Sequence, residues 1–112
     1  MLMACLVAFC LTLANPSVAQ RCRQALALGM DVSLSVDTVD FSLQRGGLAR
    51  ALTDPEVMQA FLSDPDDLVY RAVYEWSGQY DQALLVDWTP VVSPATLNGI
   101  AEKLLASPQL GR

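Results

Sequence analysis

Residues 25–37 read Ala-Leu-Ala-Leu-Gly-Met-Asp-Val-Ser-Leu-Ser-Val-Asp, and this stretch decides the expected fold. Residues 25–30 are a continuous apolar run, as expected of a strand that is buried on both faces in a parallel sheet. Residues 31–35 are polar at every second position and form a loop. Asp37 can cap a helix over residues 38–52, in which Phe41, Leu48 and Leu52 share one face. The stretch therefore predicts a strand, a loop and a helix.

The rest of the chain supplies more elements of the same kinds. A short helix can begin at Pro55, and Val, Tyr and Trp residues predict strands over 68–76 and 82–88. The link between these strands is too short for a crossover, so they should be antiparallel. Ser93 and Pro94 open a last helix with an apolar stripe over residues 97–105. About three strands and three helices in this order predict an incomplete α/β fold, a three-layer, doubly wound, Rossmann-like sheet.

The first nineteen residues predict a cleavable signal peptide. They contain no charged side chain, have an apolar core, and end in Ser17-Val18-Ala19, which are small residues suited to cleavage. No Lys or Arg precedes the apolar run, so the alternative is an uncleaved segment that acts as a weak membrane anchor. We expect a protein exported to the periplasm or the medium, with a mature domain over residues 20–112.

Composition excludes several classes of function. The chain has 7 basic and 12 acidic residues and a net charge of −5, which argues against a nucleic-acid partner. It has no histidine, the commonest general base and zinc ligand. Of its three cysteines, only Cys22 lies in the expected mature part, where an odd cysteine suggests an absent partner.

Asp31, Ser33 and Ser35 form the one motif that carries chemistry, D-x-S-x-S at the end of the predicted buried strand. Alternation turns the three side chains toward one side, and their oxygens suit a hard cation, Mg²⁺ in the first place, or Mn²⁺ or Ca²⁺. Open α/β sheets bind ligands at the carboxyl ends of their strands. The plain alternative is that Asp and Ser serve here only as turn and cap residues.

The motif resembles the first part of the metal-ion-dependent adhesion site of von Willebrand factor A domains. Over residues 22–107 the chain is more similar still to an uncharacterised bacterial family of exported proteins with that fold. The resemblance implies a Mg²⁺-dependent module that binds a protein ligand, whose carboxylate completes the metal shell. The segments that carry the resemblance are Cys22–Leu28, Asp31–Asp37, Leu43–Arg45, Gly47–Ala49, Asp54–Val57 and Glu75–Gly78.

The chain departs from that family's pattern in two ways. Leu34 stands where the family usually has Gly. The loops that would carry a further Thr and Asp ligand are expected after the last helix, beyond Arg112, so the resemblance covers the N-terminal half of the domain and three of its five usual ligands. We therefore expect the edge of the strand over residues 25–30 to be open to self-association.

Three functions compete on these grounds. The first is an exported protein-interaction module with a partial adhesion site and no catalysis. The second is a non-functional fragment of a longer reading frame. The third is a hydrolase or phosphotransferase that uses Asp31, but such chemistry needs a second Asp where Ser33 stands and a Lys, and the chain has only Lys103. Glu75, which would need a partner if buried, is expected in a solvated position.

Overall fold

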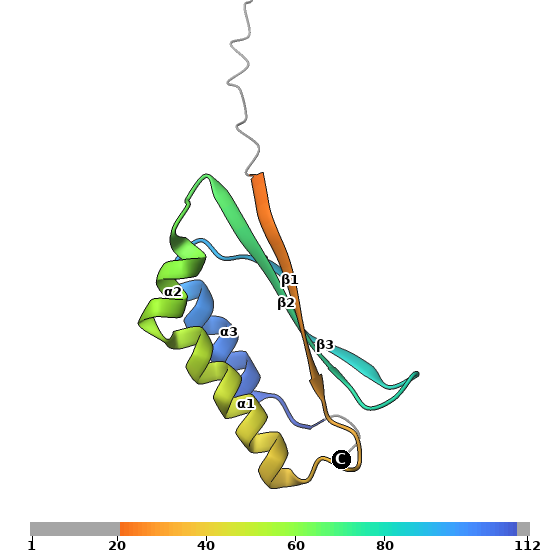
Figure 1. Cartoon of the computed structure of the whole chain (residues 1–112). Coiled ribbons are helices and arrows are strands. Elements are labelled where there is room, and N and C mark those ends of the chain that lie inside the picture. Colours follow the sequence, from red (N-terminus) through yellow and green to blue (C-terminus); the bar gives the residue numbers. More distant parts are fainter. Residues whose placement is uncertain (1–20, 110–112) are drawn as a thin grey trace, which may run out of the picture.

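A computed structural model describes residues 21–109 of the chain as one sheet with three helices (Figure 1). No helix among these residues is long and apolar enough to cross a membrane. The predicted signal peptide lies outside the described residues. In chain order the elements are β1 (Arg21–Asp31), α1 (Thr38–Thr53), α2 (Pro55–Leu62), β2 (Asp67–Trp76), β3 (Gln82–Pro90) and α3 (Pro94–Ala106).

The sheet is mixed and has the strand order β1-β2-β3. β1 is parallel to β2, from the pair Arg21↔Asp67 to the pair Asp31↔Trp76, with a bulge between Cys22 and Gln24. α1 and α2 form the crossover between these two strands. β2 and β3 are antiparallel, as the short link between them predicts. The predicted α/β class and the incomplete Rossmann-like arrangement are thus confirmed.

Local capping explains where the helices begin. The Asp37 side chain accepts hydrogen bonds from the backbone N–H groups of Val39 and Asp40, both at 2.8 Å, and starts α1. Asp54 caps α2 in the same way, and Pro55 is its first residue. α3 begins at Pro94 as predicted, although the Ser93 side chain makes no capping hydrogen bond.

All three helices lie on one side of the sheet, as Figure 1 shows. The core between them and the sheet is apolar, and Leu97 and Leu104 of α3 are fully buried in it. The predicted apolar side of α1 is confirmed, because Phe41 and Leu52 are buried and Leu48 packs against the core. The main core cluster consists of Met30, Leu52, Val73, Val86, Val91, Leu97, Ile100 and Leu104.

The prediction that residues 25–30 are buried on both faces is wrong for these residues. Met30 is buried and Leu26 and Leu28 are half-buried, whereas Ala25, Ala27 and Gly29 are exposed. The cause is the period of two along a strand: one set of side chains faces the helices, and the other faces the uncovered side of the sheet.

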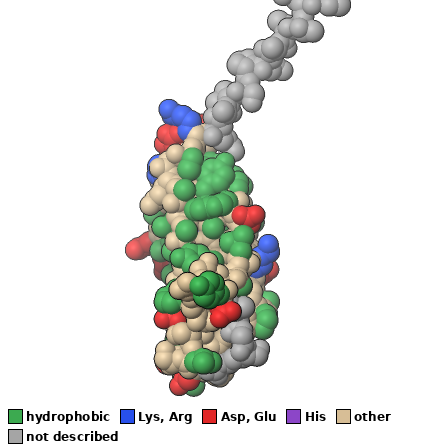
Figure 2. Space-filling model, turned by 90° about the vertical axis from the view of Figure 1, so that its right-hand side faces the viewer, with side chains coloured by type: hydrophobic (Ala, Val, Ile, Leu, Met, Phe, Trp, Pro, Cys, Tyr) green, Lys and Arg blue, Asp and Glu red, His purple; other side chains and the backbone are tan. Residues whose placement is uncertain are grey.

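The uncovered side of the sheet is rich in apolar side chains (Figure 2). Tyr74 lies across Gly29, where an added Cβ would come within 2.6 Å of the tyrosine ring. Leu84 pairs with Tyr74, and Leu84 and Trp88 are 60% and 50% exposed. Tyr74 therefore packs on this face of the sheet, where it covers a glycine that has no side chain of its own.

Candidate functional site

The predicted D-x-S-x-S motif lies where β1 ends and the chain turns toward α1. β1 ends at Asp31, and the buried Val32 donates a backbone hydrogen bond of 2.9 Å to the carbonyl of Trp76, extending the contact with β2. Beyond Val32 the chain leaves the sheet, and α1 begins at Thr38. Asp31 and Ser33 are half-buried and Ser35 is exposed, so the motif is accessible from solvent.

The structure brings the three predicted site residues together. The backbone N–H of Ser33 donates to Asp31 Oδ1 at 2.9 Å, and the hydroxyl oxygens of Ser33 and Ser35 are 3.1 Å apart. The backbone N–H of Ser33, and secondarily its hydroxyl, lower the pKa of Asp31 below its usual range. From α1, Gln44 donates to the Asp31 carbonyl at 3.3 Å. The result is an ionised carboxylate beside two hydroxyls at the carboxyl end of a parallel strand.

This donor set fits a hard divalent cation in kind. All three side chains offer oxygen, and Mg²⁺ prefers oxygen ligands while it retains several waters. The three side chains carry one negative charge between them, that of the Asp31 carboxylate. Residues 21–109 contain no cluster of three or more acidic, Cys or His side chains that could hold a metal. The Asp31–Ser33 bond also closes the turn by itself. The three oxygens could therefore supply about half of an octahedral shell, with the remaining positions left to water or to a partner.

A buried ion pair lies beside Met30, the residue that precedes Asp31. Glu75, the β2 partner of Met30, is 1% exposed, and its Oε1 is 3.3 Å from Nη2 of Arg45 on α1. The Arg45 guanidinium also lies 4.1 Å from the centre of the Phe41 ring. The expectation that Glu75 is solvated is wrong, because its side chain faces the helices rather than the uncovered side. The sequence did indicate a buried charge, because Arg45 lies on the same helix face as the apolar residues Phe41, Leu48 and Leu52.

Arg71 is a second buried cation that sequence reasoning missed. It is 3% exposed, faces the helix side of β2, and lies 4.3 Å from the centre of the Phe61 ring of α2. Burial lowers its pKa to about 10. Its Nε and Nη1 have no hydrogen-bond partner among the described residues. Such a group destabilises the fold unless the ring contact offsets the lost hydration.

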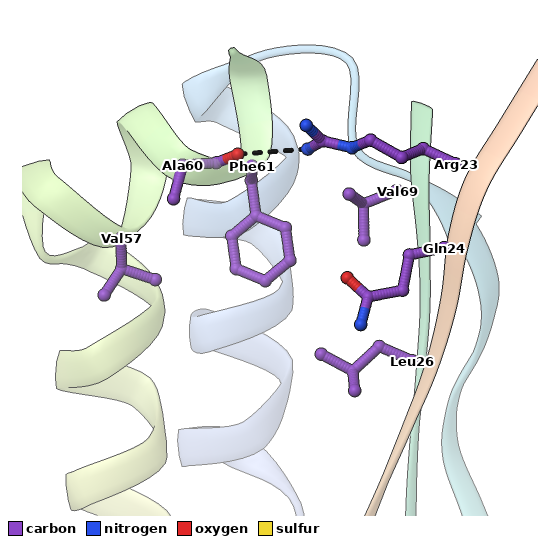
Figure 3. A pocket seen from close by; sticks show the side chains of 7 residues that line it. All are labelled: Arg23, Gln24, Leu26, Val57, Ala60, Phe61 and Val69. Atoms are coloured by element: carbon purple, nitrogen blue, oxygen red, sulfur yellow. Dashed lines mark hydrogen bonds between the residues drawn. The ribbon is translucent and has the colours of Figure 1, made fainter. Parts of the chain in front are cut away.

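A hollow of about 210 Å³ between β1 and α2 has no comparable chemistry (Figure 3). Its one charged lining residue, Arg23, donates to the Ala60 carbonyl at 3.1 Å and to the Ser63 hydroxyl at 2.9 Å. These bonds satisfy the C-terminal end of α2. The Phe61 ring, Leu26 and Val69 make the rest of the hollow largely apolar. We therefore place the candidate site at the Asp31 loop and not here.

The order of elements and the sheet define an α/β protein with a partial Rossmann-like arrangement. Residues 21–112 match a family described as a protein of unknown function, DUF1194, and the chain belongs to this family. Searches of curated proteins and of solved structures found no significant match. The family match agrees with the expected likeness to an uncharacterised family, and the likeness to von Willebrand factor A domains stays a prediction.

Proposed function

We propose that this protein is an exported, non-catalytic protein-interaction module that holds a divalent cation at Asp31, Ser33 and Ser35. The observation that supports the proposal is the convergence of one carboxylate and two hydroxyl oxygens at the carboxyl end of β1. In open α/β sheets this is the edge at which ligands bind. Mg²⁺ suits the three oxygens best, and Mn²⁺ and Ca²⁺ accept the same kind of donor.

Each of the three residues would have a distinct task. Asp31 supplies the negative charge, and the hydrogen bond from Ser33, which lowers the pKa of Asp31, favours its ionised form. Ser33 and Ser35 supply neutral oxygens, and the exposed Ser35 leaves the outer side of the site open. A bound Mg²⁺ would offer its remaining coordination positions to water or to a carboxylate of a partner protein. The pairing of a cation with a partner's acidic side chain would give the module its specificity.

We further propose that the module performs no catalysis. Phosphoryl transfer through Asp31 would need a second carboxylate where Ser33 stands, and the chain contains no histidine to act as a general base. Glu75, the nearest buried acid along the adjacent strand, is already paired with Arg45. The arrangement therefore favours binding over chemistry.

The cation proposal is tested by nuclear magnetic resonance with Mn²⁺ as the probe. We expect Mn²⁺ to broaden the amide signals of residues 31–36 of the mature chain, with a dissociation constant on the order of 10⁻⁴–10⁻³ M. Asp31→Ala should abolish the broadening. Asp81→Ala, which removes an exposed carboxylate from the link between β2 and β3, should leave it unchanged. Equal broadening in both variants would remove Asp31 from the site, and no broadening in the parent chain would reject the proposal.

The proposed export is tested by expressing the full chain in a bacterial host with a C-terminal tag. Because the apolar, uncharged residues 1–19 end in small residues, we expect mass spectrometry of the protein from the periplasm or medium to show an N-terminus at Gln20. A chain that keeps Met1 and stays in the membrane fraction would contradict cleavage and support the anchor alternative.

A further inference from the structure

Two contacts hold the loop that follows Asp31, one from the sheet and one from α1. Val32 is buried and donates its backbone N–H to the Trp76 carbonyl of β2 at 2.9 Å. Gln44 of α1 donates its side-chain amide to the Asp31 carbonyl at 3.3 Å. The loop over residues 32–37 is short and joins the end of β1 to the start of α1 (Figure 1). Its conformation therefore depends on where α1 lies relative to β2.

The Arg45–Glu75 pair joins α1 to β2 next to both of these contacts. Arg45 follows Gln44 in α1, and Glu75 precedes Trp76 in β2. Nη2 of Arg45 lies 3.3 Å from Oε1 of Glu75, and the two side chains are 9% and 1% exposed. The ring of Phe41, one turn earlier in α1, lies 4.1 Å from the guanidinium and limits its movement. Polar contacts thus link α1, β2 and the loop to one another.

A buried ion pair can fix the position of a helix in a way that apolar contacts do not. Leu48 and Leu52 also attach α1 to the core, but the burial of apolar surface is non-directional. A hydrogen bond between charged groups is directional, and setting the register of packed elements is the best-attested use of buried polar groups. The pair is therefore suited to hold α1 at one position along β2.

We infer that Arg45 and Glu75 are positioning residues for the proposed cation site. By fixing α1 on β2, the pair holds the loop so that Asp31, Ser33 and Ser35 present their oxygens together. Neither side chain needs to touch the cation, because both act through the backbone that carries the ligands. The effect on the cation rests on the proposed function, whereas the effect on the loop does not.

The double variant Arg45→Met/Glu75→Leu separates positioning from stability. It removes both buried charges together, which avoids most of the cost of a broken pair but leaves no directional contact. We expect hydrogen exchange of the Val32 amide, measured without cation, to be about two- to thirtyfold faster than in the parent chain. The dissociation constant for Mn²⁺, followed through the broadening of the loop amide signals, should rise by a similar factor.

Arg71→Met is the matched control for this experiment. It makes the same Arg-to-Met change at another buried position of β2, which lies opposite Leu26 and away from the loop. It should leave the Mn²⁺ affinity unchanged and the Val32 exchange no faster than in the parent chain. Urea denaturation of each variant gives the global stability against which the exchange of the loop is compared.

Glu75→Gln and Glu75→Met provide a second comparison where the double variant does not fold. Both remove the negative charge that faces Arg45, but only glutamine keeps an oxygen that can accept a hydrogen bond from its guanidinium. The Val32 amide should therefore exchange faster in Glu75→Met than in Glu75→Gln. Equal exchange in these two variants would overturn the inference.

The outcomes for the loop and for the cation are distinguishable. Val32 exchange and Mn²⁺ affinity like those of the parent chain in a folded double variant would overturn the inference, because the pair would then serve stability alone. Faster exchange without a loss of Mn²⁺ affinity would overturn the role at the cation site. Absence of Mn²⁺ broadening in the parent chain would reject the proposed function instead, and Val32 exchange would still decide whether the pair positions the loop.

Discussion

Arg71 shows how one side chain can limit the stability of a small fold. Its guanidinium is buried above the Phe61 ring, and two of its nitrogens lack a hydrogen-bond partner within residues 21–109. No carboxylate pairs with it in this part of the chain. Two unsatisfied buried donors at about 1–3 kcal/mol each cost about 2–6 kcal/mol together, whereas a desolvated cation–ring contact returns about 2 kcal/mol. The net effect of the charge is therefore destabilising.

We expect Arg71→Met to raise the free energy of unfolding by about 1–2 kcal/mol. Methionine keeps an unbranched, apolar side chain of shorter length, and it removes the charge, the unsatisfied donors and the guanidinium–ring contact. Urea denaturation followed by circular dichroism measures the change. Arg50→Met, at an exposed position of α1, is the control and should shift stability by less than about 0.5 kcal/mol. A loss of stability in Arg71→Met would mean that the ring contact outweighs the cost of burial.

At the residue scale, the sequence predicted oxygen donors better than it predicted buried charges. The proximity of Asp31, Ser33 and Ser35 could be predicted because all three lie within five residues, so local geometry alone brings them together. Glu75 and Arg45 are 30 residues apart, and their contact exists only once α1 packs on β2. The sequence of a strand predicts that alternate side chains lie on opposite faces of the sheet, but it does not predict which face the helices cover. The burial of Glu75 could therefore not be predicted from the sequence of β2.

At the scale of elements, the Arg45–Glu75 pair fixes α1 against the carboxyl end of β2. Both side chains lie inside an otherwise apolar interface, and Nε of Arg45 has no hydrogen-bond partner in the described residues. Loss of Glu75 removes the carboxylate that lies 3.3 Å from the buried Arg45 guanidinium, and breaking a buried pair in this way costs far more than the pair contributes. The pair therefore constrains how α1 sits on the sheet more than it adds stability.

We expect Glu75→Leu and Arg45→Met to destabilise the fold by about 3–5 kcal/mol each, and the double variant to recover most of that loss. Chemical denaturation of the four proteins gives the coupling energy directly. Where a single variant does not fold cooperatively, a folded double variant would still demonstrate the recovery. Additive losses in the double variant would show that the two side chains act independently, contrary to the 3.3 Å contact.

The helices were the most predictable elements, because their start signals are local. Asp37 and Asp54 accept the backbone hydrogen bonds of the first turns of α1 and α2, as Asp followed by a helical pattern indicates. β1 was found, but not its environment. Alanine and glycine fit both buried and exposed positions, so the run over residues 25–30 could not distinguish a strand with two covered faces from one with a single covered face.

For the whole molecule, the α/β class followed from the order of strands and helices, and the short link fixed the antiparallel pair. The side of the sheet that carries the helices depends on long-range packing, which the sequence pattern does not encode. The same packing leaves an apolar sheet face and the outer edges of β1 and β3 unpaired by other strands within residues 21–109.

The parallel pairing of β1 with β2 also affects the order in which the strands can pair during synthesis. Arg21 and Asp67 are 46 residues apart in the chain, whereas Trp76 and Gln82 of the antiparallel pair are six apart. Closing a long loop costs more entropy and is slower than forming a hairpin. β1 is made before the other strands, yet it can pair only after β2 has been synthesised. Until β2 has been synthesised, the apolar segment of β1 has no strand to pair with. The rate of translation between β1 and β2 therefore sets a minimum time during which the unpaired segment can aggregate.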